Sequence, residues 1–126
     1  NVWNILESMN LLSFANKKIN TFSGGMKRKI NLALGLIHNP SIVFLDEPTA
    51  GVDIYNKRII MRFLKEKHAQ GVTIIYSSHD LNEAEKFCSH ITLINKGKIV
   101  ENGETKDLLS KSNSSSLESF CLKIMN

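Results

Sequence analysis

The chain has 126 residues, of which 42% are hydrophobic and 22% are charged, and its formal net charge is +4. This composition predicts a globular domain that folds in water, and it excludes a disordered chain and a small disulfide scaffold. The longest basic block is residues 27–29, so nucleic acid is not an expected partner.

Three further features concern location. No apolar run approaches the roughly 18–20 residues that a membrane-spanning helix needs, so a membrane role would come through a partner. Cys88 and Cys121 have neither metal-ligand spacing nor a disulfide framework, which fits a reducing compartment. The chain begins with Asn1 and its first methionine is Met9, so we expect it to be cut from a longer polypeptide.

Apolar periodicity predicts the elements of the first part of the chain. Residues 2–12 have helical spacing, and a polar connector follows. A second helix starts after the Ser-Gly-Gly sequence at residues 23–25 and ends near Pro40. The continuous apolar run at residues 42–45 predicts a strand that is buried on both faces of a parallel sheet.

A strand, helix and strand unit follows. Residues 54–68 predict a helix that Gly71 ends, and the β-branched run at residues 72–76 predicts the second strand. Together with residues 42–45 they form a βαβ unit of ordinary length.

The last part of the chain predicts smaller elements. Residues 80–88 form a helix, and residues 91–95 and 98–102 form an antiparallel hairpin at a sheet edge. A polar helix at residues 104–109 then precedes a serine-rich linker, residues 110–116, and a terminal helix with Leu117, Phe120, Cys121 and Ile124 on its apolar face.

Two adjacent carboxylates, Asp46 and Glu47, come directly after the buried strand. Ligands of open parallel sheets bind at the carboxyl ends of the strands. Nucleotide hydrolysis needs one oxygen ligand for Mg²⁺ and one group that activates water, and two such carboxylates can divide these roles. A polar turn that ends the strand is the alternative interpretation.

Three other features also have two interpretations each. His79, after the second strand, is placed to contact a phosphate, although Ser78 or Asp80 can simply cap the next helix. Asp53 precedes a helix and is either an N-cap or a functional group. The sequence Ser23, Gly24 and Gly25 at a helix start suits an anion, and it also suits an ordinary capped helix.

The combination is more specific than its parts. Residues 22–26 (Phe-Ser-Gly-Gly-Met), residues 42–53 (Ile-Val-Phe-Leu-Asp-Glu-Pro-Thr-Ala-Gly-Val-Asp) and residues 78–80 (Ser-His-Asp) occur in this order. This pattern closely resembles the ABC (ATP-binding cassette) ATPase family. The resemblance covers nearly the whole chain, including Gly-Lys-Ile at residues 97–99.

The resemblance implies an α/β fold with the parallel sheet and flanking helices of P-loop NTPases. It also implies that ATP is sandwiched between two ATPase subunits in a head-to-tail dimer. Asp46 would help to hold Mg²⁺, Glu47 would be the general base, and His79 would contact the γ-phosphate. Asp53 would link the two sites of the dimer.

The signature loop would bind the nucleotide of the opposite subunit through Ser23, Gly24, Gly25 and Met26. Met26 replaces the family's usual glutamine, and Ile54 stands where proline is frequent. Both variants resemble bacterial exporter subunits that pair with separate membrane proteins.

The phosphate-binding sequence G-x-x-x-x-G-K-[ST] of the family does not occur in these residues. We therefore expect the sheet to be incomplete and the isolated chain to be inactive. We assign residues 1–109 to the C-terminal portion of the ATPase domain, with its signature, Walker B, D-loop and H-loop, and residues 110–126 to the linker and terminal helix.

The expected function is that of an ATP-hydrolysing subunit, cytoplasmic and bound to the inner face of the membrane, which powers export through a transmembrane permease subunit. A non-transport ABC ATPase that acts on DNA or the ribosome is one alternative. A catalytically silent fragment is the other.

Overall fold

The computed structural model describes residues 1–125 and divides the chain into two compact units. The first unit is Asn1–Ser78, and the second begins at His79. Asn126, the last residue of the predicted terminal segment, lies outside the described residues.

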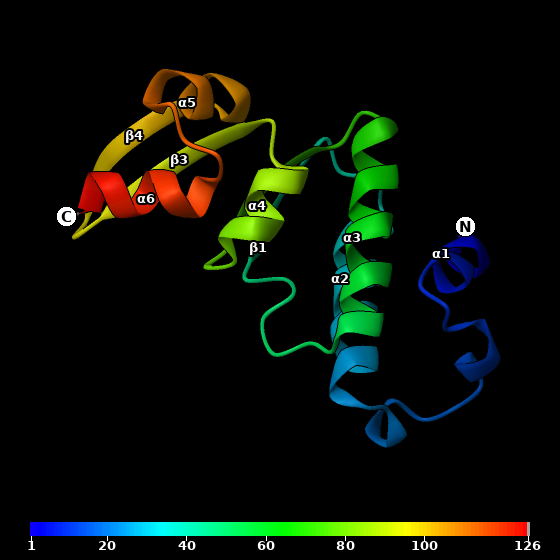
Figure 1. Ribbon diagram of the computed structural model, residues 1–126. Coiled ribbons are helices and arrows are strands. Elements are labelled where there is room, and N and C mark those ends of the chain that lie inside the picture. Colours follow the sequence, from blue (N-terminus) through cyan, green and yellow to red (C-terminus); the bar gives the residue numbers. More distant parts are fainter. Residues whose placement is uncertain (126) are drawn as a thin grey trace. The chain divides into compact units, whose positions relative to one another are not determined.

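The first unit contains the predicted βαβ unit and the helices that cover it (Figure 1). Its elements are α1 (Val2–Ser8), short 3-10 turns at Leu12–Phe14 and Ile19–Thr21, α2 (Gly24–Leu36), β1 (Ile42–Asp46), α3 (Ile54–Ala69) and β2 (Thr73–Ser77). The first helix is shorter than the predicted residues 2–12. It ends at Ser8 because Asn10 adopts a left-handed backbone conformation with φ of 54°, which asparagine tolerates better than most residues.

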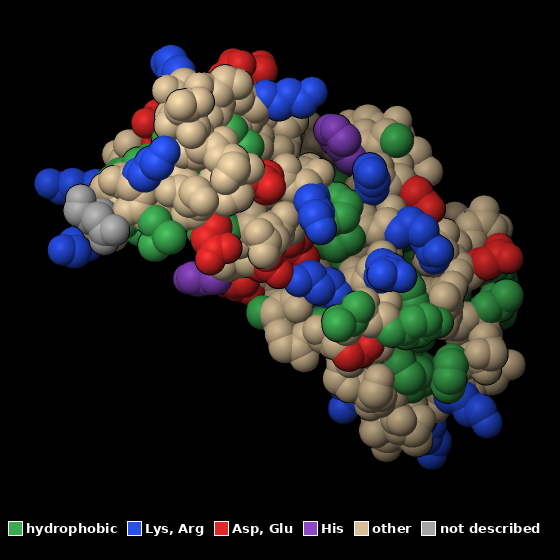
Figure 2. Space-filling model, viewed as in Figure 1, with side chains coloured by type: hydrophobic (Ala, Val, Ile, Leu, Met, Phe, Trp, Pro, Cys, Tyr) green, Lys and Arg blue, Asp and Glu red, His purple; other side chains and the backbone are tan. Residues whose placement is uncertain are grey.

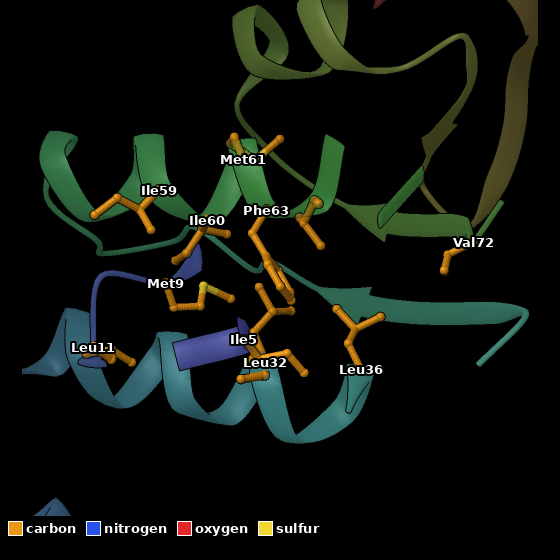
Figure 3. Close-up of a cluster of buried hydrophobic side chains, with 12 residues drawn as sticks. Ile5, Met9, Leu11, Leu32, Leu36, Ile59, Ile60, Met61, Phe63 and Val72 are labelled. Carbon is orange, nitrogen blue, oxygen red and sulfur yellow. The ribbon is translucent and has the colours of Figure 1, made fainter. Parts of the chain in front are cut away.

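The core of the first unit lies between its three α-helices and the strands. Met9, Leu36 and Ile60 are fully buried, and Phe63 is 2% exposed (Figure 3). Met9, Ile60 and Phe63 belong to the predicted apolar faces of their segments. For α2, periodicity predicted an apolar face through Met26, Ile30, Ala33, Leu34 and Ile37, but Leu34 is 61% exposed, and Leu32 and Leu36 are buried instead.

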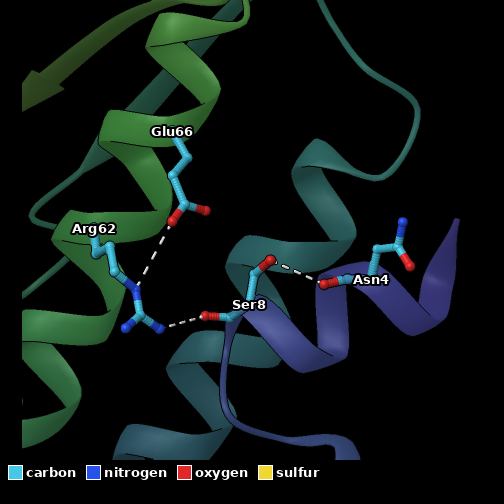
Figure 4. Close-up of polar contacts among 4 residues, drawn as sticks. All are labelled: Asn4, Ser8, Arg62 and Glu66. Carbon is cyan, nitrogen blue, oxygen red and sulfur yellow. Dashed lines mark hydrogen bonds and ion pairs between the residues drawn. The ribbon is translucent and has the colours of Figure 1, made fainter.

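Polar contacts fasten α1 to α3 (Figure 4). The Arg62 guanidinium donates a hydrogen bond of 3.1 Å to the Ser8 carbonyl at the end of α1, and it lies 3.9 Å from Glu66. The Ser8 hydroxyl donates to the Asn4 carbonyl at 2.9 Å. The bond to Ser8 satisfies one of the carbonyl groups that a helix end leaves without an intrahelical partner.

The sheet of the first unit has one covered face. β1 pairs with β2 in parallel, with Ile42 opposite Thr73 and Asp46 opposite Ser77. Val43 and Leu45 pack against the core, but the exposed fractions of Ile42 and Phe44 are 54% and 76%. The prediction that residues 42–45 are buried on both faces is therefore wrong for this chain. The two-stranded sheet follows the alternation of a half-buried strand, because successive side chains point to opposite faces.

The second unit packs a hairpin against three helices (Figure 1). Its elements are α4 (Leu81–Phe87), β3 (His90–Asn95), β4 (Lys98–Glu104), α5 (Thr105–Ser112) and α6 (Leu117–Met125). Lys96 and Gly97 form the turn with φ of 50° and 75°, as two-residue hairpin turns require. The hairpin was predicted at a sheet edge. Among the described residues, β3 and β4 instead pair only with each other.

The C-terminal helix is part of the core of the second unit. Leu117 is 1% exposed, and its backbone N–H donates to Glu85 Oε1 of α4 at 2.5 Å. The predicted serine-rich linker is shorter than residues 110–116, because α5 continues to Ser112. The boundary between the two compact units lies between residues 78 and 79, and the assignment of residues 1–109 to the ATPase domain stays a prediction.

The surface charge is mixed. On the face that Figure 2 shows, the Lys and Arg side chains are scattered and stand beside acidic ones. Within residues 1–125, no helix combines the length and apolar character that crossing a bilayer requires.

Candidate functional site

The carboxyl ends of β1 and β2 bring three polar residues together. Ser77 is the register partner of Asp46, and its hydroxyl donates a hydrogen bond of 2.6 Å to Asp46 Oδ1. The backbone N–H of Glu47 donates to Ser77 Oγ and to the Ser77 carbonyl, both at 3.2 Å. One residue of β2 therefore contacts both the predicted metal ligand Asp46 and the predicted general base Glu47.

The chain turns sharply after β1. Glu47 has a φ of 47°, in the left-handed region that residues other than glycine rarely adopt. The Ala50 N–H donates to the Glu47 carbonyl, and the Val52 N–H donates to the Thr49 carbonyl, each at 3.2 Å. The polar-turn interpretation of Asp46 and Glu47 is thus correct as local structure, and this turn presents the two carboxylates at the end of the strand.

The donor set at this strand end fits Mg²⁺ held together with a nucleotide. Asp46 is exposed and offers carboxylate oxygen, the ligand type that Mg²⁺ prefers. Within the described residues, no group of three or more His, Cys, Asp and Glu side chains could hold a metal ion. Mg²⁺ usually binds proteins through one or two carboxylates while phosphates and water complete its shell, so a single aspartate fits this mode.

His79 follows β2 and is the first residue of the second unit. Its side chain is exposed. Asp80 caps α4, since its Oδ1 accepts a hydrogen bond of 3.0 Å from the Glu83 N–H. The capping interpretation therefore applies to Asp80, and the grouping of His79 with the two carboxylates stays a prediction.

The start of α2 carries the Ser-Gly-Gly sequence. Ser23 is the N-cap, and its Oγ accepts a hydrogen bond of 3.2 Å from the Met26 N–H. Gly24 is exposed, and a Cβ added there would meet nothing within 4 Å. At Gly25 an added Cβ would lie 2.5 Å from Nδ2 of Asn56. Gly25 therefore packs closely against the Asn56 side chain, and Gly24 has open space beside it.

The start of α3 lies against Gly25. Asp53 is the N-cap of α3, and its Oδ2 accepts from the Asn56 N–H at 3.1 Å while its Oδ1 accepts from Asn56 Nδ2 at 2.7 Å. Hydrogen bonds from the Asn56 side chain and then its backbone hold the pKa of Asp53 below its usual value. Asn56 thereby joins the helix starts of α2 and α3.

A buried lysine lies in the second turn of α2. Lys29 is 2% exposed, and its Nζ donates a hydrogen bond of 2.8 Å to the Met9 carbonyl. Burial lowers the pKa of Lys29, and the negative charge of Asp53 partly opposes this shift.

No role was predicted for Ser77, Asn56 or Lys29, although Ser77 was expected at the same strand end as the carboxylates. The position of Ser77 was available as a signal, because a parallel strand that ends in register with Asp46 brings its last residue beside that carboxylate. Lys29 precedes buried Leu32 and Leu36 by three and seven residues, so it shares their helix face. The contact between Asn56 and Gly25 depends on how the two helices pack and had no signal in the sequence.

Comparisons with known proteins identify relatives of this chain. The protein family described as "ABC transporter" matches residues 1–50. The chain is 40% identical over 107 residues to the linearmycin resistance ATP-binding protein LnrL of Bacillus subtilis (strain 168), covering 85% of this chain and 34% of that protein. It is 35% identical over 105 residues to the Nod factor export ATP-binding protein I of Cupriavidus pinatubonensis (strain JMP 134 / LMG 1197), covering 83% and 32%.

A solved structure described as the ATP binding subunit of an ABC transporter has the same fold. It superposes with a TM-score of 0.85 and 23% sequence identity, and the match covers 98% of this chain and 52% of that one. The chain thus spans about a third of the two curated relatives and about half of this structure. On its motifs, fold and relatives, the chain belongs to the ABC transporter ATP-binding family and corresponds to part of that family's nucleotide-binding domain.

Proposed function

We propose that this chain supplies part of the Mg²⁺-dependent ATP-hydrolysing site of an ABC transporter subunit that powers export. The observation that carries the proposal is the strand-end group, in which Ser77 is hydrogen-bonded to Asp46 and Glu47 at the carboxyl ends of two parallel strands. Ligands of parallel α/β sheets bind at this edge.

The two carboxylates have different proposed roles. Asp46 would hold Mg²⁺, which when bound helps to neutralise the charge of the phosphate groups. Glu47 would orient the attacking water and accept its proton as a general base. His79, two residues after the end of β2, would contact the γ-phosphate through a ring nitrogen.

The signature loop, residues 22–26, would bind the nucleotide held by a second ATPase subunit. Ser23 and Gly24 are exposed at the start of a 13-residue helix, whose N-terminal dipole favours an anion. Met26 lies in the first turn, and its N–H already bonds to Ser23. Gly25 would keep the loop close to α3, and Asp53 would link the two nucleotide sites of the dimer.

Export and membrane association are supported by the relatives. The relatives include a resistance ATP-binding protein and an export ATP-binding protein. We propose that the complete subunit is cytoplasmic, lies at the inner face of the membrane, and pairs with a second ATPase subunit and a transmembrane permease.

The test uses the full natural polypeptide that contains this chain. It should hydrolyse ATP only with Mg²⁺, and Glu47→Gln should lower kcat by about 10²- to 10⁴-fold while ATP still binds. Phe44→Leu is a matched control in the same strand. Turnover that Glu47→Gln leaves intact would show that Glu47 is not the base.

A second measurement separates a transporter subunit from an ABC ATPase that acts on DNA or the ribosome. The natural polypeptide, purified from its own cells in mild detergent, should bring down a polytopic membrane protein. Recovery with nucleic acid or ribosomes would favour the non-transport alternative.

The 126-residue chain by itself should show no turnover above background, because it contains no G-x-x-x-x-G-K-[ST] sequence for the β- and γ-phosphates. Phosphate release from ATP by the purified chain measures this. Hydrolysis that Glu47→Gln abolishes would contradict the expectation.

A further inference from the structure

The hydroxyl group of Ser77 stands between the two proposed catalytic carboxylate residues. It donates to Asp46 Oδ1 at 2.6 Å and accepts from the Glu47 N–H at 3.2 Å. A serine hydroxyl has one proton and two lone pairs. It can therefore make both bonds at the same time, with the proton toward the carboxylate and a lone pair toward the amide.

The bond to Asp46 fixes the orientation of a side chain that is otherwise exposed. Its length of 2.6 Å is in the range of hydrogen bonds from a hydroxyl to an ionised oxygen. A carboxylate that is held in this way keeps its remaining coordination sites aimed in one direction. Partners of this kind outside the ligand shell commonly change metal affinity or activity by 10- to 100-fold when they are removed.

The bond to Glu47 acts on the backbone. Glu47 has the left-handed φ of 47°, and its N–H is held by both the hydroxyl and the carbonyl of Ser77. Residues keep such conformations when several contacts with the surrounding structure hold them there. Without the hydroxyl, the Glu47 N–H would lose one of these two hydrogen bonds.

We propose that Ser77 is a positioning residue, whose single hydroxyl sets the Asp46 carboxylate for Mg²⁺ and the Glu47 backbone for the attack of water. This inference rests on the proposed function, since it assigns a further residue to the same site. Ser77 acts through its two neighbours and needs no contact with the nucleotide.

The test compares Ser77→Ala with Ser77→Thr in the full natural polypeptide. Ser77→Ala should raise the Mg²⁺ concentration for half-maximal ATP turnover by about tenfold and lower kcat by about tenfold, with the KM for ATP changed less than about twofold. Ser77→Thr retains the hydroxyl and should restore both quantities to within about threefold of wild type.

Thr73→Val is the matched control. Thr73 is exposed and lies on the same face of β2, four residues before Ser77, so this variant removes a hydroxyl from the strand far from the carboxylates. It should leave the Mg²⁺ dependence and kcat unchanged.

Amide hydrogen exchange of Glu47, followed by NMR in the nucleotide-free protein, gives a readout that is independent of turnover. Ser77→Ala should accelerate the exchange by about tenfold, and Ser77→Thr should not. If Ser77→Ala does not fold, Ser77→Cys replaces it, because a thiol is a weak donor of similar shape.

The outcomes separate the two proposals. Normal Mg²⁺ dependence and normal Glu47 exchange in Ser77→Ala would overturn the role of Ser77, as would equal damage in Ser77→Ala and Ser77→Thr. The proposed function would be overturned instead if the wild-type protein showed no Mg²⁺-dependent turnover, or if Glu47→Gln left that turnover intact.

Discussion

The strand-end group (Asp46, Glu47 and Ser77) and the helix-start junction (Ser23, Gly25, Asp53 and Asn56) are built in different ways. At the strand end, residues from two strands share hydrogen bonds and Asp46 remains exposed. At the junction, a glycine packs against an asparagine, and both helix-capping side chains already accept bonds from their own helices.

This difference between the two regions shows that conserving chemical groups and conserving shape are separate requirements on the residues of a motif. The strand end needs particular chemical groups, because carboxylate oxygens are what metal binding and proton transfer use. The junction first needs a particular shape, because Gly25 leaves no room for a Cβ beside Asn56. Substitutions at the strand end should therefore change activity with little change in stability, whereas substitutions at the junction should change stability in addition to any effect on the proposed nucleotide contacts.

Among the variants that test this comparison, Asp46→Asn in the full natural polypeptide should have the largest effect. The amide keeps the size of the side chain and loses the charge that binds Mg²⁺, so Mg²⁺-dependent ATP turnover should fall by about 100-fold or more. The midpoint of thermal unfolding should change little, because Asp46 is exposed. If the variant unfolds at a temperature well below that of the wild type, the strand end also contributes to stability, and the contrast with the helix-start junction does not hold.

Gly25→Ala should have the next largest effect, on stability. The new methyl would lie 2.5 Å from Asn56 Nδ2, and crowding of this kind costs about 1–3 kcal/mol of the free energy of unfolding. Urea unfolding measures this cost. Gly24→Ala, where nothing lies within 4 Å, is the control and should be neutral within about 0.5 kcal/mol.

Asn56→Ala provides the second half of a double-mutant cycle. Removing the amide makes room for the methyl, so Gly25→Ala should cost less in the Asn56→Ala background than in the wild type. Strictly additive free energies of unfolding would mean that Gly25 and Asn56 are not coupled.

The smallest effect is expected for Asp53→Asn. Hydrogen bonds from Asn56 lower the pKa of Asp53 from its usual 3.8, so the ionised carboxylate stabilises the folded state above about pH 3.8. This contribution is lost as the pH falls through the folded-state pKa. The wild type should be more stable than Asp53→Asn at neutral pH, and the two urea-unfolding midpoints should converge in acid. A difference that does not depend on pH would mean that the charge of Asp53 contributes nothing.

Much of this fold follows from local patterns in the sequence. Helical periodicity identified the face of α3 that forms the core and part of the buried face of α2. The continuous apolar run identified β1, and the β-branched run identified β2. The position of each residue in the repeat of a helix or strand decides which face of the element it lies on, so an apolar face can be recognised from the sequence. The order and spacing of the motifs also carried the family resemblance, which the relatives confirmed.

Three properties were decided only by tertiary structure. The alternation of exposed Ile42 and Phe44 with partly buried Val43 and Leu45 depends on which face of the sheet other elements cover, and a continuous apolar run does not contain that information. The contact of Gly25 with Asn56 depends on the packing of two helices that are separate in sequence. The bridge from Ser77 to Asp46 and Glu47 depends on the parallel register, which joins residues 30 and 31 positions apart through one hydroxyl.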